Sequence, residues 1–237
     1  RSRTVRRPAE SPACVLPERF RDWFGQRGWE PRPHQLALVE QVGRRTSTLL
    51  IAPTGAGKTL AGFLPSLVSL TAKGRPTRAA GLHTLYISPL KALAVDVARN
   101  LVTPVEEMGL PIRIETRTGD TSVARRQRQR TRPPDILMTT PEQVALLLSH
   151  EEAPYLFGDL DTVVLDELHA LAPSKRGDLL SLDLARLNTL APGLVTIGLS
   201  ATVAEPSRLR AYLMPQSDPD ACCELADLIV TGGGAKP

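Results

Sequence analysis

The chain has 237 residues, of which 42% are hydrophobic and 23% are charged, so we expect a folded domain with a sizeable core and not a disordered chain. Its net charge is +4, but four of the 29 basic residues are arginines within the first seven positions, and without them 25 basic residues balance 25 acidic ones. The overall charge is therefore no indication of a nucleic-acid partner. The sequence has no apolar run of about 18 residues, which argues against a membrane-spanning protein, and no apolar stretch follows the basic N-terminus, which argues against an exported one.

Short apolar runs alternate with longer amphipathic stretches after residue 30. The runs predict strands over 48–51, 84–88, 112–116, 135–139, 162–166, 195–200 and 227–230, and the stretches predict helices over 58–70, 90–108, 121–130, 141–149, 177–190 and 205–213. Two further amphipathic helices are expected before the first strand. This alternation is typical of an α/β fold with a mostly parallel sheet and helices on both faces.

Three segments are expected along the chain. Residues 1–28 form a basic tail and a helical lead-in, residues 29–231 form the α/β domain, and residues 232–237, which are rich in glycine, form the start of a linker.

The segment APTGAGKT at 52–59 is a phosphate-binding loop between an apolar strand and a helix. Its glycines allow the backbone N–H groups to point at phosphate oxygens, and the helix N-terminus favours an anion. Lys58 is expected to meet the β- and γ-phosphates, and the Thr59 hydroxyl to bind Mg²⁺. The predicted ATP-binding residues of this loop are Pro53, Thr54, Gly55, Ala56, Gly57, Lys58, Thr59 and Leu60.

Two adjacent carboxylates, Asp166 and Glu167, end the apolar run at 162–165. At the carboxyl end of a strand, Asp166 can hold Mg²⁺, and Glu167 can take a proton from the water that attacks the γ-phosphate. Acids at a strand end are common, and only together with the phosphate-binding loop do they indicate nucleotide hydrolysis.

The quartet Asp166-Glu167-Leu168-His169 resembles the DExH box of superfamily 2 helicases, and further motifs follow the order of that superfamily. Pro33-His34-Gln35 resembles the Q motif, in which Gln35 reads the adenine edge. SPLKALA at 88–94 resembles motif Ia, RTGD at 117–120 the TGD element, TTPE at 139–142 motif Ib and SAT at 200–202 motif III. The fold implied is a RecA-like P-loop NTPase domain that uses ATP and Mg²⁺.

The same motifs imply roles for further residues. Contacts with nucleic acid are implied for Pro89, Leu90, Lys91, Arg117, Gly119, Asp120, Thr139, Thr140, Pro141 and Glu142. Coupling between the ATP site and the nucleic-acid site is implied for Ser200, Ala201 and Thr202. His169, counted with Lys58, Asp166 and Glu167 among the catalytic residues, is expected to hydrogen-bond towards this last motif.

The resemblance is closest to the large helicase-related (Lhr) family, on SPLKALAVDVARNL, on RTGDT with its arginine-rich continuation and on DELHAL followed by SKRG at 174–177. Within that family it is closest to the bacterial ligase-associated helicases. It implies ATP-driven translocation on single-stranded or partly duplex DNA, a setting in DNA repair and repair proteins such as a DNA ligase as partners. Members continue into a second RecA-like domain with an arginine finger and into C-terminal modules, so we expect little ATPase activity from the present chain by itself.

Several alternatives stay open at this level. The adenine-stacking aromatic is unassigned among Trp29, Phe24 and Phe20, and the arginine run at 124–132 is equally consistent with a solvated helix face and a phosphate track. No motif reads the ribose 2′-hydroxyl, so an RNA helicase is an alternative, as is a nucleotide-binding interaction module without translocation.

The remaining histidines and the cysteines do not show the spacing of a metal-binding site. His34, His83 and His150 are not spaced for metal binding, and neither are Cys14, Cys222 and Cys223. An adjacent Cys222–Cys223 disulfide would be strained, so we expect reduced thiols in a cytoplasmic protein.

Overall fold

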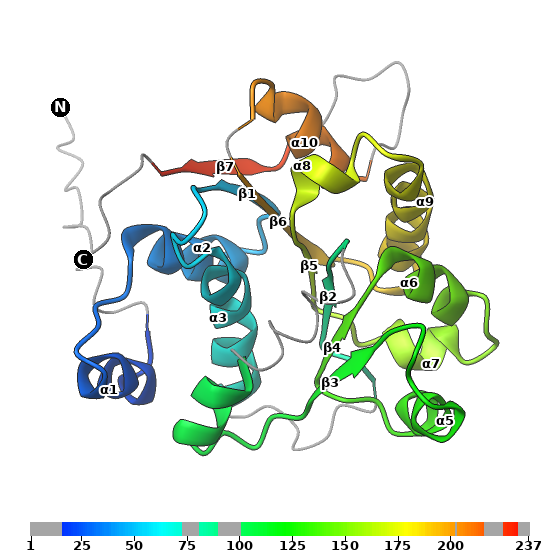
Figure 1. Ribbon diagram of the computed structural model, residues 1–237, viewed down its shortest axis with the longest axis horizontal. Coiled ribbons are helices and arrows are strands. Elements are labelled where there is room, and N and C mark those ends of the chain that lie inside the picture. Colours follow the sequence, from blue (N-terminus) through cyan, green and yellow to red (C-terminus); the bar gives the residue numbers. More distant parts are fainter. Residues whose placement is uncertain (1–15, 73–80, 90–100, 202, 216–224, 232–237) are drawn as a thin grey trace, which may run out of the picture.

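Seven parallel strands form the centre of the protein, which we describe from a computed structural model covering residues 16–72, 81–89, 101–201, 203–215 and 225–231. The strands lie in the order β3-β4-β2-β5-β6-β1-β7, and every hydrogen-bonded pair is parallel (Figure 1). Their bounds are β1 Thr48–Ile51, β2 Thr84–Ile87, β3 Ile114–Arg117, β4 Ile136–Thr139, β5 Thr162–Leu165, β6 Val195–Ser200 and β7 Asp227–Val230. The expected α/β class with a parallel sheet is confirmed.

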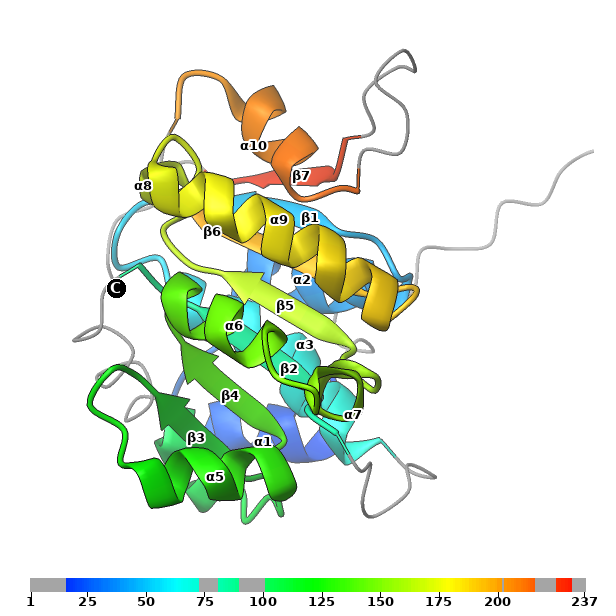
Figure 2. The same cartoon turned by 90° about the vertical axis from the view of Figure 1, so that its right-hand side faces the viewer.

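Helices cover both faces of the sheet. On one side lie α1 (Glu18–Gln26), α2 (Pro33–Gly43) and α3 (Lys58–Thr71), and on the other lie α6 (Pro141–Leu148), α7 (Ala153–Phe157) and α9 (Lys175–Leu190). Helix α5 (Val123–Thr131) lies beside the edge strand β3, and α10 (Pro206–Tyr212) lies near β7 (Figure 2). A single turn, α8 (Leu168–Leu171), follows β5, and residues 101–107 are helical as well.

Each predicted strand is present, with ends that differ by at most two residues, because buried β-branched runs are strong local signals. The single-turn helix α8 and the five-residue helix α7 were not predicted, since neither is long enough to show a helical period. Of the helix expected over 90–108, the described part is helical at 101–107. Residues 1–15, 232–237, Leu90, Lys91 and Thr202 lie outside the described part, and the division at residue 28 stays a prediction.

Two apolar clusters separate according to the face of the sheet. One joins Phe20 and Trp23 of α1 with Phe63 of α3 and alternate strand residues such as Tyr86 and Val164. The other joins the intervening strand residues with α6, α7 and α9. Alternation along each strand therefore assigns every side chain to one of two layers. Among the described helices, none combines the length and apolar character that a bilayer crossing requires.

The strand order divides the carboxyl edge of the sheet into two halves. The ends of β5, β6 and β1 are neighbours, and they carry the loops with the predicted ATP-binding residues. The ends of β3, β4 and β2 form the other half and carry the segments predicted to contact nucleic acid. Ligands of open α/β sheets bind at this edge, so the topology brings both predicted sites to one side of the molecule.

Candidate functional site

The phosphate-binding loop connects β1 to α3. Gly55 and Gly57 have φ angles of 81° and 74°, a left-handed conformation that glycine adopts without steric cost. The loop thereby turns tightly, and Lys58 becomes the first residue of α3. The Lys58 ammonium donates a hydrogen bond to the Ala52 carbonyl over 2.8 Å, which leaves two of its three donors for phosphate oxygens.

Residues of helix α2 contact the phosphate-binding loop. His34 Nε2 lies 2.9 Å from the Ala56 carbonyl oxygen, and a Cβ added to Gly57 would approach Gln35 Nε2 to 3.1 Å. Burial lowers the pKa of His34, so the ring is neutral and donates to the loop. The Gln35 amide oxygen accepts the Arg32 N–H over 2.9 Å, so its amide NH₂ group is the part that faces the loop. The sequence did not single out His34 for this contact.

Asp166 lies behind the loop, on the α3 side of the sheet. Its Oδ1 accepts the Glu167 backbone N–H over 2.9 Å, and its Oδ2 accepts a hydrogen bond from the Tyr86 hydroxyl over 2.5 Å. The Thr59 hydroxyl lowers the pKa of Tyr86 against the effect of burial, so it lies near the phenol. The two predicted Mg²⁺ ligands thus lie near one phenol group that sequence reasoning missed, and Asp166 is hydrogen-bonded to it.

Burial raises the pKa of the Asp166 carboxyl, and the hydrogen bond from Tyr86 and the charge of Lys58 oppose that rise. Burial also raises the pKa of Tyr86 well above its ordinary value. The phenol therefore keeps its proton and serves as the hydrogen-bond donor to the carboxylate. The signal in the sequence was a single tyrosine in a buried aliphatic strand, because a buried hydroxyl needs a partner.

Glu167 has a φ of 48°, a left-handed angle that is uncommon for a side chain of this size and concentrates at functional sites. Its Oε2 lies 3.5 Å from Nδ1 of His169. The same nitrogen lies 3.2 Å from the Ser200 hydroxyl oxygen and 3.4 Å from the Ala201 backbone nitrogen. The structure thereby brings the DExH segment and the first two residues of the SAT segment into contact.

A cavity of about 360 Å³ opens beside the phosphate-binding loop. Its lining consists of Trp23, Arg27, Trp29, Gly57, Thr59, Leu60, Leu101, Thr103 and Pro104. Phe20 and Phe24 are buried in the core, whereas the Trp29 side chain is 50% exposed. Of the three aromatic residues considered for adenine stacking, the structure thus places Trp29 at a cavity next to the loop.

The Trp29 indole belongs to an ordered cluster. The Arg27 guanidinium carbon lies 4.9 Å from the Trp29 ring centroid and 5.3 Å from that of Trp23. Glu107 accepts hydrogen bonds from Arg27 Nε over 2.9 Å and from Trp23 Nε1 over 2.7 Å. This pairing holds the guanidinium within cation–π distance of both indoles.

The residues predicted to contact nucleic acid divide by exposure. Gly119, Asp120 and Glu142 are exposed, and Pro89 is half-buried. Four others are buried: Arg117, Thr139, Thr140 and Pro141. Arg117 is only 3% exposed, because α5 covers it, and its guanidinium donates to the Arg126 carbonyl over 3.3 Å. The prediction that the Arg117 side chain contacts nucleic acid at the surface is therefore not supported, because that side chain is buried under α5.

The buried and exposed members of the TTPE segment are held by protein contacts. The Thr139 hydroxyl donates to the Arg117 carbonyl over 2.9 Å. Glu142 accepts hydrogen bonds from Arg176 Nε and Nη2 over 2.5 and 3.1 Å, and this pairing, against the effect of burial, lowers the pKa of Glu142. The start of α6 is thereby tied to the start of α9.

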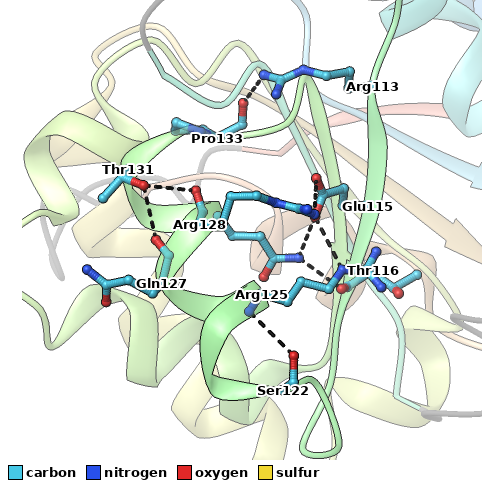
Figure 3. A network of polar contacts seen from close by, with 10 residues as sticks. Arg113, Glu115, Thr116, Ser122, Arg125, Gln127, Arg128, Thr131 and Pro133 are labelled. Carbon is cyan, nitrogen blue, oxygen red and sulfur yellow. Dashed lines mark hydrogen bonds and ion pairs between the residues drawn. The ribbon is translucent and has the colours of Figure 1, made fainter.

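The arginine run forms a network within the protein. Arg125 and Arg128 of α5 donate to the Glu115 carboxylate of β3 over 3.4 and 3.0 Å, as Figure 3 shows. Arg126 donates to the carbonyl oxygens of Thr118 and Gly119. Because these guanidinium groups already have acceptors within the protein, the contacts of α5 hold β3 and the TGD turn in place.

Oxygen ligands for a cation are few in this region. Within the part of the chain that the structure describes, no group of three or more His, Cys, Asp and Glu residues could hold a metal ion. A hydroxyl and a single carboxylate suit Mg²⁺ shared with nucleotide phosphates, since that ion keeps several waters and few protein ligands.

Comparison with known proteins identifies relatives over most of the chain. The sequence profile described as DEAD/DEAH box helicase matches residues 32–209. The chain is 41% identical over 215 residues to the "Lhr helicase/probable uracil glycosylase" of Mycolicibacterium smegmatis, covering 86% of this chain and 14% of the relative. It is 41% identical over 222 residues to the "Lhr helicase/uracil glycosylase" of Escherichia coli, covering 85% and 14%. The chain therefore spans a small part of these relatives.

A solved structure, that of the Mycobacterium smegmatis helicase Lhr bound to single-stranded DNA and AMP-PNP, has the same fold. It superimposes with a TM-score of 0.79 and 38% identity, over 95% of this chain and 28% of that chain. The RecA-like arrangement expected from the motifs is thereby confirmed.

Proposed function

Because this chain belongs to the DEAD/DEAH box helicase family, we propose that it is the first RecA-like motor domain of an ATP-dependent DNA helicase of the Lhr type. ATP binds with its phosphates on the loop at 52–59 and its adenine in the cavity beside Trp29. Lys58 binds the β- and γ-phosphates with the donors it does not use on Ala52. Gln35 reaches the base through its amide NH₂ group.

The residues present fit a magnesium ion at this site. Thr59 and Asp166 supply a hydroxyl and a carboxylate, and both groups lie near the Tyr86 phenol, which is hydrogen-bonded to Asp166. When bound with ATP, Mg²⁺ would neutralise charge on the phosphate oxygens. Glu167, next in sequence, is the base that takes a proton from the attacking water.

The observation that carries the proposal is the contact of His169 with both Glu167 and Ser200. The Ser200 carbonyl also accepts the Ala52 backbone N–H over 3.1 Å, so one short chain of contacts joins the base, the SAT segment and the start of the phosphate-binding loop. Such a connection suits a motor, in which hydrolysis must be transmitted, better than a small-molecule kinase.

We place single-stranded DNA across the ends of β2, β3 and β4, where the segments around Pro89, Gly119 and Thr140 lie side by side. Helix α6 begins at this edge, and helix N-termini favour the binding of phosphates. The relative of known structure that carries single-stranded DNA, at 38% identity, supports DNA over RNA.

The test is an ATPase assay of the whole protein with single-stranded DNA, with RNA of the same sequence and with neither. We expect stimulation by DNA and weaker or no stimulation by RNA. Stimulation by RNA alone would favour the RNA helicase, and no stimulation by either would favour a nucleotide-binding interaction module.

The proposal includes a second RecA-like domain as the partner that completes the nucleotide cleft, since the relatives are several times longer than the matched region. A role in DNA repair beside a DNA ligase is its most specific part and rests on the resemblance to the ligase-associated helicases. Co-purification of the tagged whole protein with a ligase, in cells treated with a DNA-damaging agent, tests that part separately.

A further inference from the structure

Tyr86 is a fully buried polar residue in the middle of the sheet. It lies on β2, opposite Val164 of β5 in the parallel register, and has no exposed surface. Because side chains alternate along strands, Tyr86 and Asp166, two residues beyond Val164, point to the same face. The Tyr86 hydroxyl group can therefore reach the Asp166 carboxylate, which lies just beyond the end of β5.

The ring of Tyr86 is held in place by helix α3. It stacks on the ring of Phe63 with a centroid distance of 4.5 Å and an interplanar angle of 13°. Phe63 follows Thr59 by four residues, so both side chains project from the same face of the helix. The stack therefore sets where the phenol oxygen lies relative to the Thr59 hydroxyl.

The hydroxyl group of Tyr86 orients the carboxylate of Asp166, one of the two predicted cation ligands. It donates to Asp166 Oδ2, while the Glu167 backbone N–H donates to Oδ1, so both carboxylate oxygens are fixed by one bond each. A carboxylate has about four acceptor positions, and the remaining ones face away from these donors. The orientation of the carboxylate is thus determined before any ligand arrives.

Resting on the proposed function, we infer that Tyr86 is a positioning residue for magnesium: its hydroxyl holds the Asp166 carboxylate in the orientation that Mg²⁺–ATP needs. Tyr86 touches neither the nucleotide nor the ion. It acts through Asp166, much as outer hydrogen-bond partners orient the ligands of other metal sites.

The variant Tyr86→Phe removes one oxygen atom and keeps the stacked ring. Binding of a fluorescent ATP analogue to the chain is titrated in EDTA and then over a series of Mg²⁺ concentrations. We expect the affinity without metal to stay within about twofold of wild type, because the phosphate-binding loop is intact. The Mg²⁺ concentration for half-maximal enhancement should rise by about 10–100-fold, the usual effect of losing such a partner.

Tyr212→Phe is the matched control. It also deletes one hydroxyl, which donates to the Gly177 carbonyl over 2.6 Å, but Tyr212 packs against the apolar cluster on the opposite face of the sheet from Tyr86. Its Mg²⁺ requirement should equal that of wild type. Thermal melts of both variants compare their folding.

A double-mutant cycle separates positioning from a general effect on structure. If Tyr86 acts through Asp166, then Tyr86→Phe adds nothing further to the Mg²⁺ requirement of Asp166→Asn. Additive effects, an unchanged Mg²⁺ requirement in Tyr86→Phe, or an equal loss of affinity in EDTA and in Mg²⁺ would each overturn the inference. If wild type itself shows no gain from Mg²⁺, the proposed ATP site is wrong, which is a different result.

Discussion

The Nδ1 atom of His169 lies 3.2 Å from the hydroxyl oxygen of Ser200, although 31 residues separate them in the sequence. His169 belongs to the turn after β5 and Ser200 to the end of β6, and these strands are neighbours in the sheet. Glu167 Oε2 lies 3.5 Å from the same nitrogen, so one imidazole atom contacts both the residue predicted to act as the base and the end of β6.

Glu167→Gln should separate binding from turnover. Asp166 keeps its bond from the Glu167 backbone N–H, which the substitution does not touch, so binding of Mg²⁺–ATP should persist. Loss of the base should lower turnover by about 10²–10⁴-fold in the whole protein. Binding is measured with a fluorescent ATP analogue and turnover by phosphate release. If binding is lost together with turnover, the roles assigned to the two carboxylates are wrong.

Lys58→Ala should abolish nucleotide binding while the fold stays intact. The substitution removes the hydrogen bond from the Lys58 ammonium to the Ala52 carbonyl, a single bond worth about 1 kcal/mol, so the thermal melt should shift little. Isothermal titration with ATP and Mg²⁺ measures the loss. Near-normal affinity in a folded variant would contradict the assignment of the phosphate-binding loop.

Trp29→Ala should weaken binding of ATP by roughly tenfold, because stacking of a base on an aromatic ring contributes about 1–3 kcal/mol. Trp29→Phe should retain most of the affinity. Tyr155→Ala is the control, since this aromatic residue of α7 is similarly exposed, at 47% against 50% for Trp29, and does not line the cavity. Unchanged affinity in Trp29→Ala would place the adenine elsewhere.

Arg126→Gln should weaken binding of single-stranded DNA, because it removes the donor to the Thr118 and Gly119 carbonyls that shapes the TGD turn. Arg128→Gln removes the same charge from the same helix but loses only contacts with the Glu115 carboxylate, which Arg125 and Gln129 also contact. Binding is measured over a range of salt, where each phosphate contact contributes a slope of about −0.7. Equal losses in both variants would indicate a general effect of charge and no role for the turn.

Asp183 predicts a dependence of stability on pH. This residue of α9 is 7% exposed, its Oδ2 has no hydrogen-bond partner in the described structure, and burial raises its pKa from 3.8 to about 6. Between these two values the folded state binds more protons than the unfolded state, so the contribution of Asp183 to the free energy of unfolding falls as pH rises.

Asp183→Asn removes this titration. The free energy of unfolding of the variant, minus that of wild type, should therefore increase by about 1–3 kcal/mol between pH 4 and pH 7. Urea unfolding at several pH values measures the difference, with Asp178→Asn on the same helix as a control for the loss of a charge. A difference that does not change with pH would contradict the shifted pKa.

Much of the fold follows from local patterns. Runs such as TLLI at 48–51 and TVVL at 162–165 predict buried parallel strands, and the strands are there, because two-sided burial demands continuous apolar residues. The loop at 52–59 is equally local, since its glycines, lysine and threonine act within eight residues. The helix α8 could not be predicted from the sequence, because a single turn is too short to show a helical periodicity.

The positions of single side chains were not determined locally. The sequence shows Arg117 beside the TGD turn, but whether it faces solvent depends on α5, which covers it in the folded protein. In the same way, the sequence does not distinguish Trp29 from Phe20 and Phe24, which lie close to it in the chain. Only packing leaves the Trp29 side chain half exposed and buries the other two.

Local sequence is enough to predict the strands, the phosphate-binding loop and the two acids that follow β5. The folded chain alone shows that β2 lies next to β5, which brings Tyr86 to Asp166, and that the carboxyl edge divides into a half predicted for ATP and a half predicted for DNA. The physical reason is that apolar and β-branched residues specify a buried strand locally, whereas strand order depends on which helices cover which face. Strand order is therefore a property of the whole core. It determines which polar side chains from different strands lie next to one another.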